Sequence, residues 1–238
     1  MVDISKILFM WTGNRPYGKL LDGLGSLRTD APICTFDLKG LGNYPDLQSV
    51  MILILTDFIL TQVEQDKVNK KRIILDEAWQ LLKSNAAAGF MEYCARTLRK
   101  TGSGITFITQ GVEEIVTSPI GPAIMNNTAT KFILLQRGDS EILKNALKLN
   151  TQELRLIYSL EQRKGEFSEG FMIEGDHRQV IRIYPSPFEY WLSTSDANDN
   201  RHIQELRASG LSLVDAIEAA ARTYPNGIAQ GKVEPEVA

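Results

Sequence analysis

The sequence predicts an α/β fold, because short apolar runs alternate with longer segments of helical pattern. The runs at residues 33–37, 72–75, 105–109 and 131–135 are short, apolar and bounded by polar residues, as buried strands are. Segments with helical periodicity separate them. With 238 residues, of which 43% are hydrophobic, the chain can bury a sizeable core as one domain plus an appendage.

The first half of the chain gives clear helix and strand signals. Ile33 to Asp37 is predicted as a short buried strand, and Pro45 to about Val63 as a helix that is apolar nearly all round and therefore largely buried. From Ala86 to Arg99 a single apolar stripe recurs at four-residue steps, at Phe90, Cys94 and Leu98. Gly102 and Gly104 end that helix, and Ile105 to Thr109 follows as a strand.

The second half predicts a hairpin and then helices. Lys131 to Leu135 is expected to be a strand, and Phe167 to Glu174 with Gln179 to Tyr184 a hairpin. Beyond Pro185 and Pro187, Ser212 and Asp215 form a capping box for a helix to about Thr223, which Pro225 stops. We expect an α/β domain over residues 1–192, a helical appendage over 193–225, and a disordered tail over 226–238.

Composition excludes several classes of protein. A formal charge of −3 argues against a constitutively basic nucleic-acid coat, although a local basic groove stays possible. Cys34 and Cys94 lack metal-ligand spacing and are expected in the core of a reduced cytosolic protein. The apolar stretch from Val50 to Leu60 contains Asp57 and is judged too short to span a bilayer, and no signal peptide is recognised. His177 and His202 have no partner spacing and are expected on the surface.

The segment from Arg72 to Trp79 carries the strongest chemical signal. Its apolar strand, expected to be buried on both faces, ends in the adjacent carboxylates of Asp76 and Glu77. In a nucleotide-hydrolysing domain the first carboxylate holds the hydration shell of Mg²⁺ and the second polarises the attacking water. The alternative is a buried strand followed by a helix that Asp76 caps.

A phosphate-binding loop, Gly-x-x-x-x-Gly-Lys-Ser/Thr, has only an imperfect counterpart in this sequence. Gly13 to Leu20 has the glycine and lysine spacing and follows the apolar run Ile7 to Trp11. However, Leu20 cannot bind Mg²⁺, and Pro16 removes a backbone N–H from a loop that works by donating N–H groups. We interpret this segment as a coincidence of spacing rather than a degenerate phosphate loop.

Together, several motifs resemble the C-terminal half of the TraC family, the VirB-type ATPases of conjugative type IV secretion systems. They occur in the family's order, over about residues 12–200: Pro16 to Gly23, Leu75-Asp76-Glu77-Ala78-Trp79, Arg96 to Gly102, Phe107 to Gly111, Phe167 to Gly170 and Tyr190 to Thr194. The resemblance implies a RecA-like P-loop NTPase domain, truncated at its N-terminus because the nucleotide loop would precede this chain, with a helical C-terminal appendage. Such a chain alone is expected to be impaired.

The resemblance also implies roles for individual residues, with ATP and Mg²⁺ as cofactors. Asp76 would hold Mg²⁺ through water, Glu77 would be the general base, and Gln110 would sense the γ-phosphate and orient water, unless it is an ordinary strand-end residue. Arg96 and Arg99, three residues apart, are candidates for an arginine finger that reaches a neighbouring subunit. They suit a solvated basic face with Lys100 equally well, and Arg137 and Arg163 are weaker candidates.

For the whole protein, the resemblance implies a ring, expected to be a hexamer, at the cytoplasmic face of the inner membrane. Partner proteins of the secretion system would hold it there, and ATP hydrolysis would power pilus assembly and the transfer of plasmid DNA or protein. Two alternatives stay open. One is a DNA-translocating motor of the coupling-protein or HerA type, and the other is a non-enzymatic module that keeps only a subunit interface.

Overall fold

A computed structural model describes residues 4–23, 31–77, 85–138 and 140–228 of the chain. These residues form two compact units, residues 1–127 and residues 128–238, and each unit is described by itself. The division between them precedes strand β3, well before the expected appendage. Ala78 and Trp79 of the motif after β1 lie outside the described residues.

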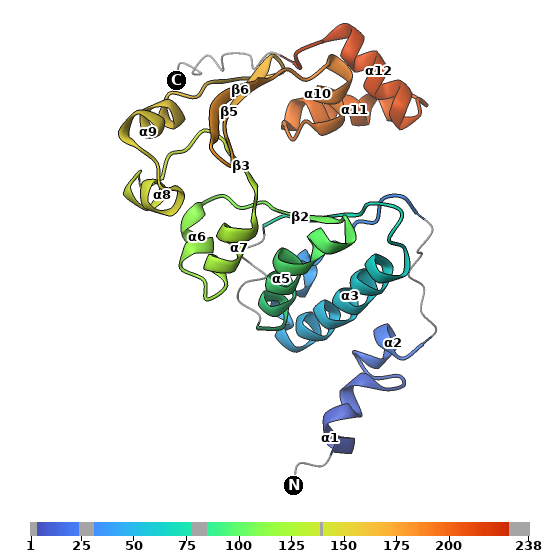
Figure 1. Cartoon of the computed structure of the whole chain (residues 1–238). Helices are drawn as coiled ribbons and strands as arrows, with labels where there is room; N and C mark the ends of the chain where they lie inside the picture. The colour runs from blue at the N-terminus through green and yellow to red at the C-terminus, as the bar shows by residue number, and fades with distance from the viewer. Residues whose placement is uncertain (1–3, 24–30, 78–84, 139, 229–238) are drawn as a thin grey trace, which may run out of the picture. The chain divides into compact units, whose positions relative to one another are not determined.

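The first unit is mainly helical and contains two strands (Figure 1). Its described elements are α1 (Ile4–Leu8), η1 (Phe9–Trp11), α2 (Gly18–Leu21), η2 (Lys39–Asn43), α3 (Pro45–Gln65), β1 (Arg72–Leu75), α5 (Asn85–Thr97), η3 (Leu98–Thr101), β2 (Gly104–Phe107), α6 (Val112–Val116) and α7 (Gly121–Asn127), where η marks a 3-10 helix. The expected helices over 45–63 and 86–99 and the strands at 72 and 105 are therefore present.

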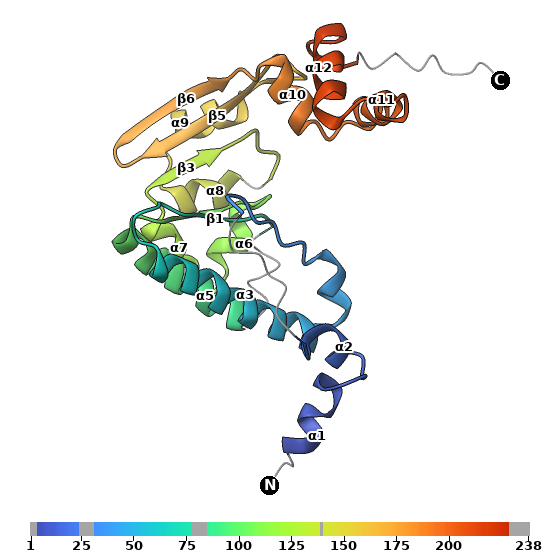
Figure 2. The same ribbon diagram turned by 90° about the vertical axis from the view of Figure 1, so that its right-hand side faces the viewer.

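Strands β1 and β2 form a parallel pair, with Arg72 opposite Gly104 and Leu75 opposite Phe107. Helices α3 and α5 lie side by side along this pair (Figure 2). The expected stripe of α5 is buried and packs with Val63 of α3 and Ile73 of β1. Along the neighbouring face of α5, a second cluster joins the helix to α6 and α7 through Met91, Ile115, Ile120 and Ile124.

The expectation that β1 is buried on both faces is wrong. Side chains of a strand alternate between two faces, and the helices cover only the face that carries Ile73. On the other face Ile74 is 60% exposed. The described part of this unit therefore presents an open apolar face of its sheet.

Helix α3 is long, apolar and only partly buried. Its 21 residues and a mean hydropathy of 1.4 are sufficient, by length and composition alone, for crossing a membrane, so the expectation that this stretch is too short is wrong. Its buried residues include Leu47, Ile52, Leu55 and Val63, but Leu53 is 62% exposed, so the helix is less buried than expected. Through Val63 the helix packs against β1 and α5.

Residues 33–37 do not form the expected strand. The chain from Ile33 to Leu38 is irregular and has no strand partner among the described residues, although Phe36 packs edge-on against Phe58 of α3, with ring centroids 5.9 Å apart. Cys34 is exposed rather than in the core, whereas Cys94 is buried. Burial raises the pKa of the Cys94 thiol to about 12, which leaves it unreactive at neutral pH.

The second unit contains an antiparallel sheet with helices. Its described elements are β3 (Thr130–Ile133), α8 (Ser140–Leu147), α9 (Thr151–Tyr158), β4 (Gln162–Arg163), β5 (Phe167–Glu174), β6 (His177–Ile183), α10 (Pro187–Ser193), α11 (Ala197–Ala208) and α12 (Leu213–Thr223). Strand β5 pairs with β3 and β4 along one edge and with β6 along the other. The expected hairpin is β5–β6, which turns at Gly175 with a φ of 58°.

The three C-terminal helices pack into a small core of their own, built on Trp191, Ile203 and Ile217. As expected, Ser212 caps α12 by accepting a hydrogen bond from the Asp215 N–H, and the helix ends at Thr223. His202 is not a plain surface residue, since its ring packs between those of Trp191 and Tyr224, at centroid distances of 6.0 and 5.5 Å.

A buried carboxylate, Asp199, connects this helical core to the chain after α12. It accepts hydrogen bonds from the Tyr190 hydroxyl (2.6 Å) and the Ile228 N–H (2.8 Å), and it lies 3.1 Å from Lys164 Nζ. Lys164 also donates to the Ile228 carbonyl. Residues 226–228, which were expected to begin a disordered tail, are therefore held in place, and residues 229–238 lie outside the described range.

Candidate nucleotide-hydrolysis site

The candidate site lies where the two parallel strands of the first unit end. The pairing continues one residue beyond β1, because the Ile108 N–H donates to the Leu75 carbonyl at 2.9 Å. Parallel strands end at the same edge of a sheet, so the residues that follow Leu75 and Phe107 meet there. This register places Asp76 and Glu77 beside Thr109 and Gln110.

The central contact of this edge joins two residues that are 33 positions apart. Gln110 Nε2 donates a hydrogen bond to Glu77 Oε1 at 2.8 Å. The amide oxygen of Gln110 can then accept a hydrogen bond from a water molecule, while the Glu77 carboxylate can take up a proton from it. The pair therefore has the groups needed to hold and deprotonate one water.

The backbone at Glu77 adopts an unusual conformation. Its φ is 51°, in the left-handed region that residues other than glycine rarely occupy. The Glu77 N–H donates to Asp76 Oδ1 at 3.0 Å, which fixes the turn immediately after the strand. Such local strain in a residue other than glycine is concentrated at functional sites.

Asp76 is exposed at the same edge and fits the role of a magnesium ligand. No group of three or more His, Cys, Asp or Glu side chains among the described residues could hold a metal ion by itself. Mg²⁺ is commonly bound through one or two carboxylates, several waters and the phosphates of a nucleotide. The single exposed carboxylate of Asp76 is compatible with that kind of coordination.

A further pair beside the site was not found by sequence reasoning. The Thr109 hydroxyl lies 2.6 Å from Glu114 Oε2 of α6, and Gly111 is the residue before that helix. This contact holds the segment that carries Gln110 against the start of α6. The sequence did carry a signal for this contact. A hydroxyl residue is followed five positions later by a glutamate, and a glycine between them directly precedes the helix.

The arginine candidates do not lie at this edge. Arg96 is near the end of α5 and forms an ion pair with Glu92 at 2.8 Å, and Arg99 is on η3. Because η3 leads into the beginning of β2, Arg99 lies toward the opposite end of the strands from Glu77. Within one chain the structure therefore does not bring either arginine together with the Glu77–Gln110 pair.

The two weaker candidates belong to the second unit. Arg163 lies 3.9 Å from Glu161 and 3.8 Å from Glu166, so its charge is engaged locally. Arg137 is exposed after β3.

The segment from Gly13 to Leu20 is not arranged as a phosphate cradle. It follows the helical residues of α1 and η1 rather than a strand, so the run from Ile7 to Trp11 does not join the sheet. Its amides are used internally: the Gly13 N–H donates to Asp22 Oδ2 at 2.7 Å, and the Lys19 N–H donates to the Arg15 carbonyl at 2.9 Å. The geometry agrees with the interpretation that the spacing is coincidental.

The profile of the TraG P-loop domain family matches residues 11–224, which is most of the chain. The chain belongs to the TraG P-loop domain family. This membership, together with the relatives below, confirms the resemblance to the TraC and VirB4 ATPases and the α/β P-loop NTPase fold.

Several relatives of this TraG-family chain are known. It is 27% identical to protein TraC of Escherichia coli strain K12 over 223 residues, which are 89% of this chain and 25% of that protein. It is 22% identical to the type IV secretion system protein virB4 of Bartonella quintana and of Bartonella henselae, over 72% of this chain and 21% of each relative. The chain thus spans about a quarter of the length of these relatives.

A solved structure supports the fold of this TraG-family chain. VirB4 of Thermoanaerobacter pseudethanolicus matches 77% of this chain and 49% of its own, with a TM-score of 0.63 and 24% sequence identity. At this identity the likeness establishes the fold alone.

Proposed function

We propose that this chain supplies the water-activating edge of an ATPase that works in a type IV secretion system. The observation that carries the proposal is the hydrogen bond between Gln110 and Glu77 at the ends of two parallel strands. In this proposal Asp76 holds the hydration shell of Mg²⁺, Glu77 is the general base, and Gln110 orients the water and senses the γ-phosphate. The names of the Bartonella relatives support the secretion role.

The proposed chemistry needs the phosphates to approach this edge from solvent. Asp76 and Gln110 are exposed and Glu77 is partly exposed, so a nucleotide can reach them. The 238 residues contain no complete Gly-x-x-x-x-Gly-Lys-Ser/Thr loop, and the proposal assigns no phosphate-cradling role to Gly13 to Leu20. Bound Mg²⁺ would neutralise phosphate charge, while the residues of this edge position and deprotonate the water.

The decisive experiment replaces the base and keeps its shape. The codon for Glu77 is changed to one for Gln in the native gene, and the encoded protein is purified. Glu77→Gln should preserve Mg-ATP binding and lower the rate of ATP hydrolysis by roughly two or more orders of magnitude. Glu113→Gln is the matched control, because Glu113 is an exposed glutamate on nearby α6. Hydrolysis that is equally fast in the Glu77 variant and the control would refute the assignment.

The proposal extends to an oligomer that shares its sites between subunits. Since Arg96 and Arg99 lie away from Glu77 of their own chain, either could serve as a finger only toward the site of a neighbouring subunit, in a ring such as a hexamer. Subunits with Arg99→Ala mixed with subunits with Glu77→Gln should then regain part of the activity. If neither Arg99→Ala nor Arg96→Ala subunits regain ATPase activity in such mixtures, the two arginines belong to a solvated surface and not to a finger.

We also propose where this ATPase acts. It would lie at the cytoplasmic face of the inner membrane, in contact with other components of the secretion system, and support conjugative plasmid transfer, pilus assembly or protein export. The Glu77→Gln allele should abolish transfer in a mating assay while the protein accumulates to its normal level. Undiminished transfer would show that ATP hydrolysis at Glu77 is not needed for conjugation.

A further inference from the structure

Basic side chains gather at the edge where β1 and β2 begin, opposite the Glu77–Gln110 edge. Lys67, Lys70 and Arg72 lie in the loop before β1 and at its first residue, and Arg99 and Lys100 lie on η3, just before β2. All five are exposed, and none forms an ion pair with another residue of the described part of the chain. We call Lys67, Lys70, Arg72 and Lys100 the basic edge. Arg99 is left out of this name because it is already a candidate for the arginine finger.

Strand pairing brings these distant parts of the sequence together. The Gly104 N–H donates to the Lys71 carbonyl at 2.9 Å, and a Cβ added at Gly104 would lie 3.6 Å from Arg72 Cζ. A Cβ at Gly102 would similarly lie 4.0 Å from Lys70 Cγ. Residues 70–72 and 102–104 line an open hollow of about 420 Å³. The glycines leave the basic side chains accessible from solvent.

The loop of the basic edge is fixed and has an apolar tip. Asp66 Oδ1 accepts the N–H groups of Val68 and Asn69, each at 3.1 Å, and Asp66 Oδ2 pairs with Lys71 Nζ at 3.2 Å. Bonds from Asn69 and Lys71 hold the pKa of the Asp66 carboxyl well below its usual range, so the turn persists at neutral pH. Val68, at the tip between Lys67 and Lys70, is 91% exposed.

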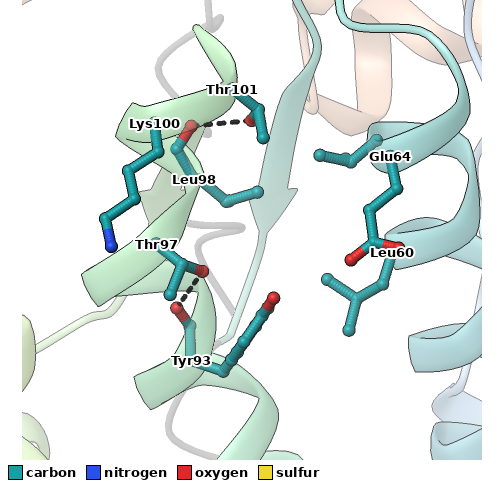
Figure 3. Close-up of a pocket in the computed structure, with 8 residues that line it drawn as sticks. Leu60, Glu64, Tyr93, Thr97, Leu98, Lys100 and Thr101 are labelled. Carbon is teal, nitrogen blue, oxygen red and sulfur yellow. Dashed lines mark hydrogen bonds between the residues drawn. The ribbon is translucent and has the colours of Figure 1, made fainter.

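The acidic groups close to the basic edge do not neutralise it. Asp66 is already paired with Lys71. Glu64 lies on the α3 wall of a neighbouring groove of about 220 Å³ whose opposite wall carries Lys100 (Figure 3). In that view the Lys100 side chain points away from Glu64. The basic edge therefore keeps a net positive charge in a chain whose overall charge is −3.

We propose that the basic edge binds the anionic surface of a lipid bilayer, with Val68 entering the headgroup region. Clustered lysines and arginines are attracted to anionic lipids, and an exposed aliphatic tip adds apolar contact that a membrane offers and a phosphate backbone does not. The N–H groups of Gly102, Ser103 and Gly104 all donate to backbone carbonyls, so these three amides are not available to bind a single phosphate. The expected interaction is therefore a non-specific electrostatic attraction to a negatively charged surface.

Two features weigh against a nucleic acid as the partner. No aromatic side chain lines the hollow between residues 70–72 and 102–104, whereas single-strand binding grooves stack bases on aromatic rings. A phosphate backbone also gives no role to Val68. The inference does not depend on the proposed ATPase chemistry, because the basic edge and Glu77 lie at opposite ends of the same strands.

Flotation of the purified 238-residue chain on vesicles tests the proposal. The chain should float with vesicles of equimolar phosphatidylglycerol and phosphatidylcholine and not with phosphatidylcholine alone, and high salt should weaken the association. Each lysine strengthens such binding roughly fivefold, so the triple variant Lys67→Gln, Lys70→Gln, Lys100→Gln should lose on the order of one hundredfold in affinity. Val68→Ser should lose several-fold.

Matched controls exclude a general charge effect. The triple variant Arg155→Gln, Arg201→Gln, Arg207→Gln removes three exposed cations from the second unit and should bind vesicles like the unchanged chain. Circular dichroism checks that all variants fold. Vesicle binding that is unchanged in the lysine variant or in the Val68 variant overturns the proposal. So does tighter binding to duplex DNA than to anionic vesicles at equal phosphate concentration.

Discussion

Asp199 shows how one side chain organises the C-terminal part of the molecule. Burial opposes its charge, but hydrogen bonds from Tyr190, the Ile228 N–H and Lys164 outweigh that penalty and lower the pKa of the carboxyl. Asp196, beside it, accepts a hydrogen bond from Lys164, which lowers its pKa to about 2. Both carboxylates are therefore ionised at neutral pH and hold a lysine, a tyrosine and the chain after α12 together.

Truncating Asp199 should destabilise the fold strongly. Asp199→Ala leaves the Tyr190 hydroxyl, the Lys164 ammonium and the Ile228 N–H without their shared acceptor, and breaking a buried charged network costs about 3 kcal/mol or more. Urea unfolding would measure the loss. Asp176→Ala, in the exposed turn of the β5–β6 hairpin, should change the unfolding free energy by less than about 0.5 kcal/mol.

Acid should loosen the same region in a defined pH range. The folded pKa of Asp196 is about 2, below its ordinary value of 3.8, so its contribution to stability is complete above about pH 4. That contribution is lost as the pH falls through 2. The indole N–H signal of Trp191, which donates to the Tyr224 carbonyl, should report the change by NMR. Asp196→Asn should flatten this dependence, and an unchanged profile in that variant would contradict the assignment.

At the scale of elements, α3 is an apolar helix whose sides differ in burial. One side of the helix packs on β1 and α5 through Val63, while Leu53 on another side is exposed. Stability should follow this asymmetry. Val63→Ala should lower the unfolding free energy by about 1 to 3 kcal/mol through lost burial and a cavity, and Leu53→Ala by less than about 0.5 kcal/mol. Equal losses in thermal unfolding would contradict this packing.

The sequence predicted the elements with a strong local signal. The stripe of Phe90, Cys94 and Leu98, the β5–β6 hairpin and the Ser212 cap are all present because periodicity and turn chemistry act over few residues. The strand expected at Ile33 to Asp37 was wrong, because apolar residues form a strand only where a partner strand is available. The burial of β1 was overestimated, because a sequence does not show which face a helix will cover.

The site was predictable in part, for a related reason. Asp76, Glu77 and Gln110 could be chosen as candidates because each follows an apolar strand, and the parallel pairing places the last two in contact. The basic edge and the Asp199 network join residues from separate segments. Their partners are set by tertiary packing, which leaves little trace in local sequence.

At the scale of the whole molecule, the chain consists of two compact units. The second unit has buried residues from its sheet and helices, such as Phe171, Ile157 and Trp191, which form cores within residues 128–238. We therefore expect residues 128–238 to fold alone. Trp191 is the sole tryptophan in this half of the sequence, so its fluorescence should show a cooperative unfolding transition in urea. A gradual, non-cooperative change would show that the unit needs residues 1–127.

The parallel pairing of β1 and β2 also has a consequence for the order of folding. Parallel strands cannot form from a tight hairpin, and the chain between β1 and β2 passes through α5, which packs on β1 through Phe90 and Cys94. Closing this long connection has an entropic cost that is met before the strands pair. We therefore expect α5 to dock first and the Glu77–Gln110 contact to form late. A newly made chain would lack the Glu77–Gln110 contact until the folding of this unit was complete, so, under the proposed function, an incompletely folded molecule would not consume nucleotide.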